Sequence, residues 1–192
     1  MITYDTDSDG NVFQIWKQDQ VSSCGVASSW MARSLVRQMS FAEDEWELAQ
    51  RMYRTGVQGA LAALGRPTSG PMTYDPRAFD TSQASVGSTF ANFGLYGSQV
   101  AAALRAEGLN VNHQNSSSLV PHLLGDTRVA IVLVAWSGGG GHFIVAARVT
   151  RGGKIVFLDP WDGRIKEQAN NGRYNSHYGN SGSVVETLYL AP

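Results

Sequence analysis

An α+β fold is the class that the sequence predicts, with N-terminal helices packed on a C-terminal antiparallel β-sheet. The N-terminal half places apolar residues at steps of three and four, which is the helical period, whereas the C-terminal half contains short runs of β-branched and apolar residues. Helices followed by strands is the order typical of α+β domains. The 192 residues show no internal repeat and no domain boundary, so we expect a single domain over residues 1–192.

Three helices are expected. The first covers about residues 23–39 and places Cys24 near its N-terminus. The second begins at a capping-box pattern formed by Ser40 and Glu43, in which each side chain accepts a hydrogen bond from the other residue's backbone N–H. A third, short helix over 98–107 is followed by a glycine that suits a helix C-terminus. Together these helices supply the helical layer of the fold.

The rest of the chain is expected to form an antiparallel sheet and two irregular segments. Pro, Gly, Ser and Thr interrupt every regular pattern in residues 66–97, which we expect to be a long irregular insertion. Residues 1–15 are expected to be a flexible or peripheral N-terminal segment. Strands are expected at 129–136, 143–149, 155–158 and 184–190, with a hairpin turn at 151–154 between the second and the third.

Charge and hydropathy exclude several classes of partner. The 15 Lys+Arg nearly balance the 16 Asp+Glu for a net charge of −1, and no basic cluster is present that would bind the phosphates of a nucleic acid. The longest apolar run, residues 129–136, is much shorter than the ~20 residues that span a bilayer. We therefore expect no nucleic-acid partner and no membrane partner. A monomeric protein is also expected.

Metal and cofactor sites are not expected either. The single cysteine cannot form an internal disulfide or a Cys-rich zinc site, and no two histidines have the i, i+4 spacing of a helical metal site.

The first residues are acidic where a secretory signal would be basic and then apolar. We expect a protein without metal or cofactor that is cytoplasmic, or that is secreted by a route without an N-terminal signal peptide.

Cys24 is the candidate nucleophile. It lies at the start of a predicted helix, where free N–H groups and the helix dipole stabilise a thiolate. Its polar and small neighbours Ser22, Ser23 and Gly25 argue against a sealed apolar site, although a free cysteine often only fills space in a core. A thiolate nucleophile also needs a base within hydrogen-bond reach.

His142 is the candidate base, and Asp159 is the candidate residue that orients it. His142 follows a run of glycines and begins a strand, so it lies at a sheet edge with room beside it. Antiparallel pairing of residues 143–149 with 155–158 brings Asp159 to the same end of the sheet as His142. Asp162 is an alternative orienting residue, and the other three histidines are expected in surface or capping roles.

Gln18 is the candidate oxyanion donor. It precedes Cys24 by six positions, and an amide N–H beside the backbone N–H of a nucleophile can donate to the oxyanion of a tetrahedral intermediate. Trp136 before the glycine run and Trp161 after the Asp-Pro pair would flank the cleft, where they shield the imidazole, bind a substrate side chain or only pack the core. Gly141 ends the glycine run, which gives the backbone freedom to approach a substrate.

Three features in this order resemble the papain-like cysteine peptidases: Gln18-x5-Cys24-Gly25, a glycine-rich approach to His142, and Asp159-Pro160. The pattern is most similar to a bacterial branch, which includes peptidases that cut the leaders of bacteriocins and secreted effector proteases of plant pathogens. The resemblance implies a papain-like fold, with Cys24 as nucleophile, His142 as general base and acid, Asp159 as orienting residue and Gln18 as oxyanion donor. It also implies a bacterial protein, with a secreted effector as one setting.

A cysteine endopeptidase that acts on a protein or peptide through an acyl-enzyme is the function that the sequence favours. The same triad supports a deamidase, a transglutaminase or a peptidoglycan amidase, because a Cys-His-Asp set fixes acyl transfer but neither the acyl donor nor the acceptor. A non-catalytic binding module that retains the fold is a third alternative. Substrate identity depends on pocket walls from several loops, and the sequence leaves it open.

Overall fold

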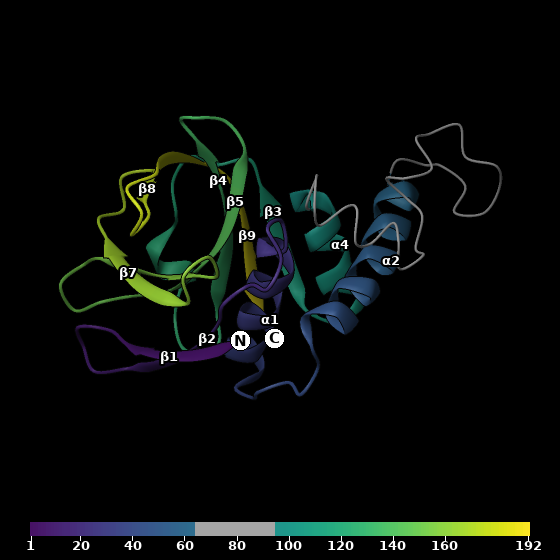
Figure 1. Ribbon diagram of the computed structural model, residues 1–192, viewed down its shortest axis with the longest axis horizontal. Coiled ribbons are helices and arrows are strands. Elements are labelled where there is room, and N and C mark those ends of the chain that lie inside the picture. Colours follow the sequence, from purple (N-terminus) through teal and green to yellow (C-terminus); the bar gives the residue numbers. More distant parts are fainter. Residues whose placement is uncertain (64–94) are drawn as a thin grey trace.

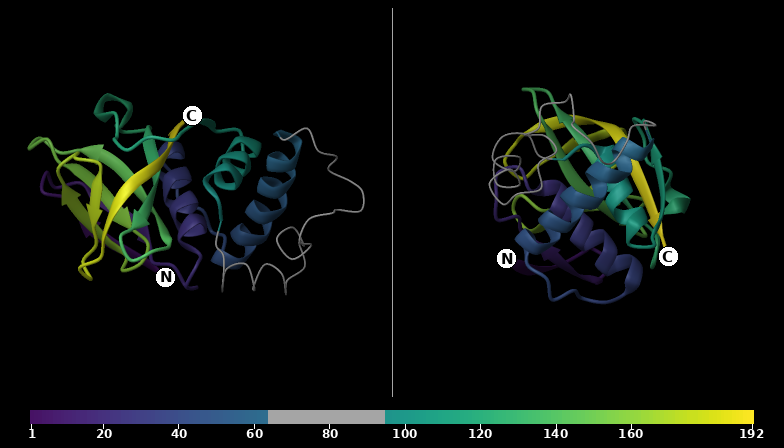
Figure 2. Two further views of the ribbon diagram at one scale, coloured as in Figure 1. Left: turned by 90° about the horizontal axis from the view of Figure 1, so that it is seen from above. Right: turned by 90° about the vertical axis from the view of Figure 1, so that its right-hand side faces the viewer.

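The computed structural model describes residues 1–63 and 95–192, and these residues form the α+β fold that the sequence predicts. Figure 1 shows a helical region beside a large sheet. In Figure 2, α1 (Cys24–Arg37) lies between that sheet and the pair formed by α2 (Glu45–Ala63) and α4 (Gly97–Ala106). The larger part of the core therefore lies where α1 meets the sheet.

The described residues form two antiparallel sheets. In the large sheet the strands lie in the order β3, β9, β4, β5, β6 and β7, and β8 pairs with β9. The strands expected from the sequence lie within β4, β5, β6 and β9, whereas β3, β7 and β8 come from short, more polar stretches. The bounds are β1 (Ile2–Thr6) and β2 (Val12–Trp16) in the small sheet, then β3 (Asn110–Gln114), the 3-10 helix η2 (Pro121–Leu123), β4 (Val129–Trp136), β5 (Gly141–Val149), β6 (Ile155–Asp159), β7 (Arg164–Gln168), β8 (Arg173–Asn175) and β9 (Ser181–Ala191).

The α1 helix is buried on nearly every side because it is the middle layer. Gly25 in its first turn allows a close contact, since a Cβ at this position would lie 3.3 Å from the Phe143 side chain and 3.5 Å from Leu95. Further along the helix, Trp30 packs edge-on against Trp16 with ring centroids 5.0 Å apart. The first contact holds the start of the helix against β5, and the second joins the helix to β2.

The capping box of α2 is not formed by Ser40 and Glu43, as the sequence suggested. Instead Asp44 Oδ1 accepts the backbone N–H of Glu47 at 2.7 Å, and Glu47 Oε2 accepts that of Asp44 at 3.3 Å. Glu43 is engaged elsewhere, because its carboxylate is drawn into ion pairs that tie α1, α2 and the end of α4 together. This network joins Glu43 and Glu107 to Arg33 and Arg51.

Most of residues 1–15, which were expected to be a flexible or peripheral segment, form the β1–β2 hairpin. Ile15 on β2 is fully buried in the core. The backbone N–H of Ile165 donates to Asp5 Oδ2 at 2.9 Å, which joins the hairpin to β7. The hairpin therefore fixes the chain just before the loop that leads to Cys24.

Most of the insertion expected over 66–97 lies outside the described residues. The chain is described again from Leu95, and α4 follows close to the helix expected over 98–107. Gly108 just after this helix has a positive φ of 78°, which favours glycine at that position. No helix in the described part of the chain combines the length and the hydropathy needed to cross a membrane.

Candidate active site

Three of the predicted site residues meet where the start of α1 faces the sheet. Cys24 is the first residue of α1, His142 is the second residue of β5, and Asp159 ends β6. The strands β5 and β6 pair antiparallel, with Val145 opposite Leu158, so the start of one strand lies near the end of the other. The close contact of α1 with β5 then brings Cys24 beside His142, and the two residues line one pocket.

The His142 ring is fixed by a buried carboxylate. His142 Nε2 lies 2.7 Å from Asp159 Oδ1, and these two residues are only 3% and 1% exposed. The same oxygen accepts the backbone N–H of Trp161 at 2.9 Å, while Asp159 Oδ2 accepts the hydroxyl of Tyr174 at 2.6 Å. Because Nε2 is used by Asp159, Nδ1 is the nitrogen left to face Cys24.

Asp162, the alternative orienting residue, does not contact His142. Its Oδ1 accepts the backbone N–H of Arg164 at 3.0 Å, and its Oδ2 lies 4.0 Å from His177 Nε2. Burial and the charge of Asp159 raise the pKa of Asp162. The structure thus places Asp159, and not Asp162, against the imidazole.

His142 and Asp159 each stabilise the charged form of the other. Burial lowers the pKa of His142, but the hydrogen bonds and negative charges of Asp159 and Cys24 outweigh burial and raise this pKa to about 9. Burial also raises the pKa of Asp159, yet the hydrogen bond and charge of His142, with the Tyr174 hydroxyl and the Trp161 N–H, hold it below its usual value. These neighbours therefore favour the protonated, positively charged form of His142.

Two tryptophans cover the imidazole. Trp136 stacks on His142 with ring centroids 5.6 Å apart and an interplanar angle of 20°, and Trp161 meets the ring edge-on at 5.9 Å. Gly182 makes room for Trp136, because a Cβ there would lie 2.9 Å from the indole and 2.5 Å from the Ala135 carbonyl oxygen. An aromatic face against an imidazolium stabilises the cation and keeps water from it.

A pocket of about 240 Å³ opens beside Cys24 and His142. It contains all three residues expected to contact a substrate, namely Trp136, Gly141 and Trp161. The remaining lining is mostly apolar and was not anticipated from the sequence. These further lining residues are Val21, Ser22, Leu95, Leu133 and Phe143.

Gln18 lies near the site, but its amide does not line this pocket. Its Nε2 donates to the carbonyl oxygens of Gln20 at 2.7 Å and Val21 at 3.0 Å, and its Oε1 is buried without a partner. Its backbone N–H donates to the carbonyl oxygen of Pro160 at 2.8 Å. The residue therefore closes the loop before Cys24 and ties it to the turn that carries Asp159.

Tyr174 is a site residue that the sequence did not indicate. It lies on β8, is fully buried, and packs edge-on against Phe157 and at a tilt against Trp136. Burial and the neighbouring Asp159 charge raise the pKa of its phenol, so the hydroxyl stays protonated and always donates to Asp159. A lone tyrosine in a polar, glycine-rich stretch gives no sequence signal for such a contact.

The other histidines lie away from the pocket. His113 Nε2 lies 2.9 Å from Glu186, His177 Nε2 bonds to the carbonyl oxygen of Ile165 at 3.0 Å, and His122 is exposed in η2. Within residues 1–63 and 95–192, no group of three or more His, Cys, Asp or Glu side chains is placed to hold a metal ion. The arrangement supports nucleophilic chemistry at Cys24.

Comparisons with known proteins add little to this geometry. No protein-family model matches the chain, and a search of curated proteins also gave no match. Among solved structures, the chain is similar to the crystal structure of the Pseudomonas avirulence protein AvrPphB, with 11% identity, a TM-score of 0.37, and coverage of 90% of this chain and 92% of that one.

The charge of His142 can be tested by an NMR titration of its imidazole. We expect the ring to stay protonated at neutral pH and to lose its proton as the pH rises through about 9, well above the usual histidine pKa of 6.5. The charged ring therefore stabilises the fold fully below about pH 6.5, and this stabilisation is lost as the pH rises through about 9. Cys24→Ala should lower the midpoint, because the charge of the sulfur raises it. An unchanged midpoint in that variant would show that the two groups do not interact.

Tyr174→Phe should lower both the stability of the fold and the reactivity of Cys24. Loss of the hydroxyl leaves the buried Asp159 Oδ2 without this donor, which should lower the free energy of unfolding by about 1–3 kcal/mol. The carboxylate then becomes free to rotate. We also expect slower alkylation of Cys24 by iodoacetamide. The matched control is Tyr189→Phe, since this buried hydroxyl accepts the backbone N–H of Val120 at 2.7 Å on another part of the sheet. Equal alkylation rates in the two variants would contradict a role for Tyr174 in the site.

Proposed function

We propose that the protein is a papain-like cysteine peptidase that hydrolyses peptide bonds in a protein or peptide. The observation that carries the proposal is the buried 2.7 Å hydrogen bond between His142 and Asp159, because His142 lines the same pocket as Cys24. A cysteine at a helix N-terminus, beside an imidazole that a carboxylate orients, is the arrangement that activates a thiol nucleophile.

In the proposed reaction, the Cys24 sulfur attacks the carbonyl carbon of the scissile peptide, and the carbonyl oxygen becomes an oxyanion. His142 gives its proton to the leaving nitrogen, the C–N bond breaks, and the acyl group remains on Cys24 as a thioester. Neutral His142 then takes a proton from water as the water oxygen attacks the thioester carbonyl. Collapse of this intermediate releases the acid and restores the thiolate and the protonated His142.

Asp159 is proposed to orient the imidazole through both halves of this cycle. Its hydrogen bond to Nε2 directs Nδ1 toward Cys24 and the leaving nitrogen. The Trp161 N–H and the Tyr174 hydroxyl also donate to this carboxylate, one to each oxygen, and hold it in place. His142 thus returns to the same position after each proton transfer.

The oxyanion is proposed to bind two N–H donors. The first is the backbone N–H of Cys24, because the first N–H groups of a helix have no partner within the helix. The second is the Gln18 amide, which turns one N–H from the Val21 carbonyl toward the pocket when substrate binds. This turn breaks no bond at Gln18 Oε1, which is unpartnered, and the bond to the Gln20 carbonyl keeps the side chain in place.

Trp136, Gly141 and Trp161 are proposed to contact the substrate. They line the same pocket as Cys24, and Trp161 is 46% exposed, which leaves its ring free to pack against a substrate side chain. Apart from Cys24 and His142, the lining formed by the described residues carries no ionisable side chain. We therefore propose that an uncharged stretch of substrate occupies this pocket.

Replacement of the nucleophile tests the proposal. Cys24→Ala should abolish both hydrolysis of a peptide library and labelling by iodoacetamide, because this is the only cysteine in the chain. Circular dichroism should show an unchanged fold, since the removed sulfur contributes little packing. Hydrolysis that survives the substitution would contradict the proposal.

The products separate the peptidase from other reactions of the same triad. Mass spectrometry of the products should show shorter peptides. A conversion of glutamine to glutamate would indicate a deamidase, a crosslink to an amine would indicate a transglutaminase, and muropeptides released from cell walls would indicate a peptidoglycan amidase. No product, together with alkylation of Cys24 at the rate of a free thiol, would indicate a binding module.

A further inference from the structure

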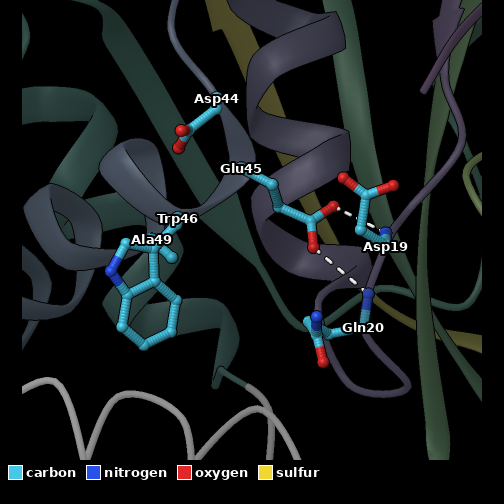
Figure 3. Close-up of a pocket in the computed structure, with 6 residues that line it drawn as sticks. All are labelled: Asp19, Gln20, Asp44, Glu45, Trp46 and Ala49. Carbon is cyan, nitrogen blue, oxygen red and sulfur yellow. Dashed lines mark hydrogen bonds between the residues drawn. The ribbon is translucent and has the colours of Figure 1, made fainter.

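A buried carboxylate lies against the loop formed by residues 18–23, which leads to Cys24. Glu45, the first residue of α2, is 6% exposed. Its Oε2 accepts the backbone N–H of Asp19 at 2.9 Å, and its Oε1 accepts that of Gln20 at 3.3 Å (Figure 3). Glu45 thus holds two successive peptides near the beginning of the loop.

The loop is closed around the backbone of Gln20. The Gln20 N–H is directed to Glu45 and to Ser23 Oγ, the latter at 3.2 Å. The Gln20 carbonyl oxygen accepts the Gln18 amide at 2.7 Å and the Ser23 hydroxyl at 3.0 Å. A shift of this one peptide would therefore move both Gln18 and the start of α1.

We propose that Glu45 is a positioning residue for the oxyanion hole. The inference rests on the proposed function. By fixing the backbone of Asp19 and Gln20, Glu45 sets the positions of the two oxyanion donors, the Gln18 amide and the Cys24 N–H. It does not touch the reacting atoms, because it lines a separate pocket of about 230 Å³ with Asp19, Gln20, Asp44, Trp46 and Ala49 (Figure 3).

A charged carboxylate suits this place better than its neutral analogues. An ionised carboxylate only accepts hydrogen bonds, and here two backbone N–H donors converge on it, one on each oxygen. Burial raises the pKa of Glu45, while the hydrogen bonds from Ser23 and the Asp19 and Gln20 N–H groups oppose this rise. A glutamine of the same shape would turn an NH2 group toward a backbone N–H, which would push the peptide away.

The rates of two reactions of the Cys24 sulfur distinguish a misplaced oxyanion hole from a general loss of structure at the site. Alkylation by iodoacetamide needs a thiolate but no oxyanion hole, because no carbonyl oxygen gains charge. Acylation by p-nitrophenyl acetate, followed by release of nitrophenolate, needs both. In Glu45→Gln we expect acylation to fall about 100-fold, the scale of losing one oxyanion donor, with alkylation within about 2-fold of the unmodified protein.

Matched variants make the outcomes distinguishable. Gln18→Ala should show the same split between the two rates, whereas Glu47→Gln, an exposed carboxylate in the same first turn of α2, should change neither. Glu45→Asp keeps the charge, so its acylation rate should fall less than that of Glu45→Gln. This variant replaces Glu45→Gln in the test if the glutamine variant does not fold. Equal loss of both rates in a folded Glu45 variant, or no loss in either, would overturn the inference. Acylation that survives in Cys24→Ala would instead overturn the proposed function.

Discussion

The proposed chemistry depends on one packing contact, the close approach of the first turn of α1 to β5. Gly25 makes this approach possible, because any larger residue would press on Phe143 at 3.3 Å. The contact brings together Cys24 and His142, which are far apart in the sequence. The position of the N-terminus of α1 determines the pocket, the placement of the proposed oxyanion donors and the charge on the imidazole.

The charged groups around that contact are buried, and each is stabilised by a partner. A buried charge is costly unless it is paired and hydrogen-bonded. Asp159 meets this condition with His142, Tyr174 and the Trp161 backbone, and Glu45 meets it with donors from the loop before Cys24. The sheet and α2 therefore support the same site from two sides, one through the imidazole and the other through the loop.

Sequence patterns predicted those features that depend on local order. The helix that starts near Cys24 and the antiparallel strands that carry His142 and Asp159 were visible as apolar periodicity and turn signals. Tyr174 and Glu45 were not, because each acts on a segment distant in sequence, and a single tyrosine or glutamate carries no sign of its partner. The capping box was misplaced for a similar reason: tertiary ion pairs claim Glu43, so the box forms one turn later. The hairpin in residues 1–15 was not predicted, because its contacts with the core and with β7 join segments that are distant in sequence.

The most direct measurement is a crystal structure of the protein after reaction with a peptidyl chloromethyl ketone. The account predicts a thioether bond to the Cys24 sulfur, an imidazole that still bonds Asp159 through Nε2, the inhibitor carbonyl oxygen at the Cys24 N–H, and the peptide between Trp136 and Trp161. An unmodified Cys24, or a sulfur separated from the His142 ring in the adduct, would contradict it.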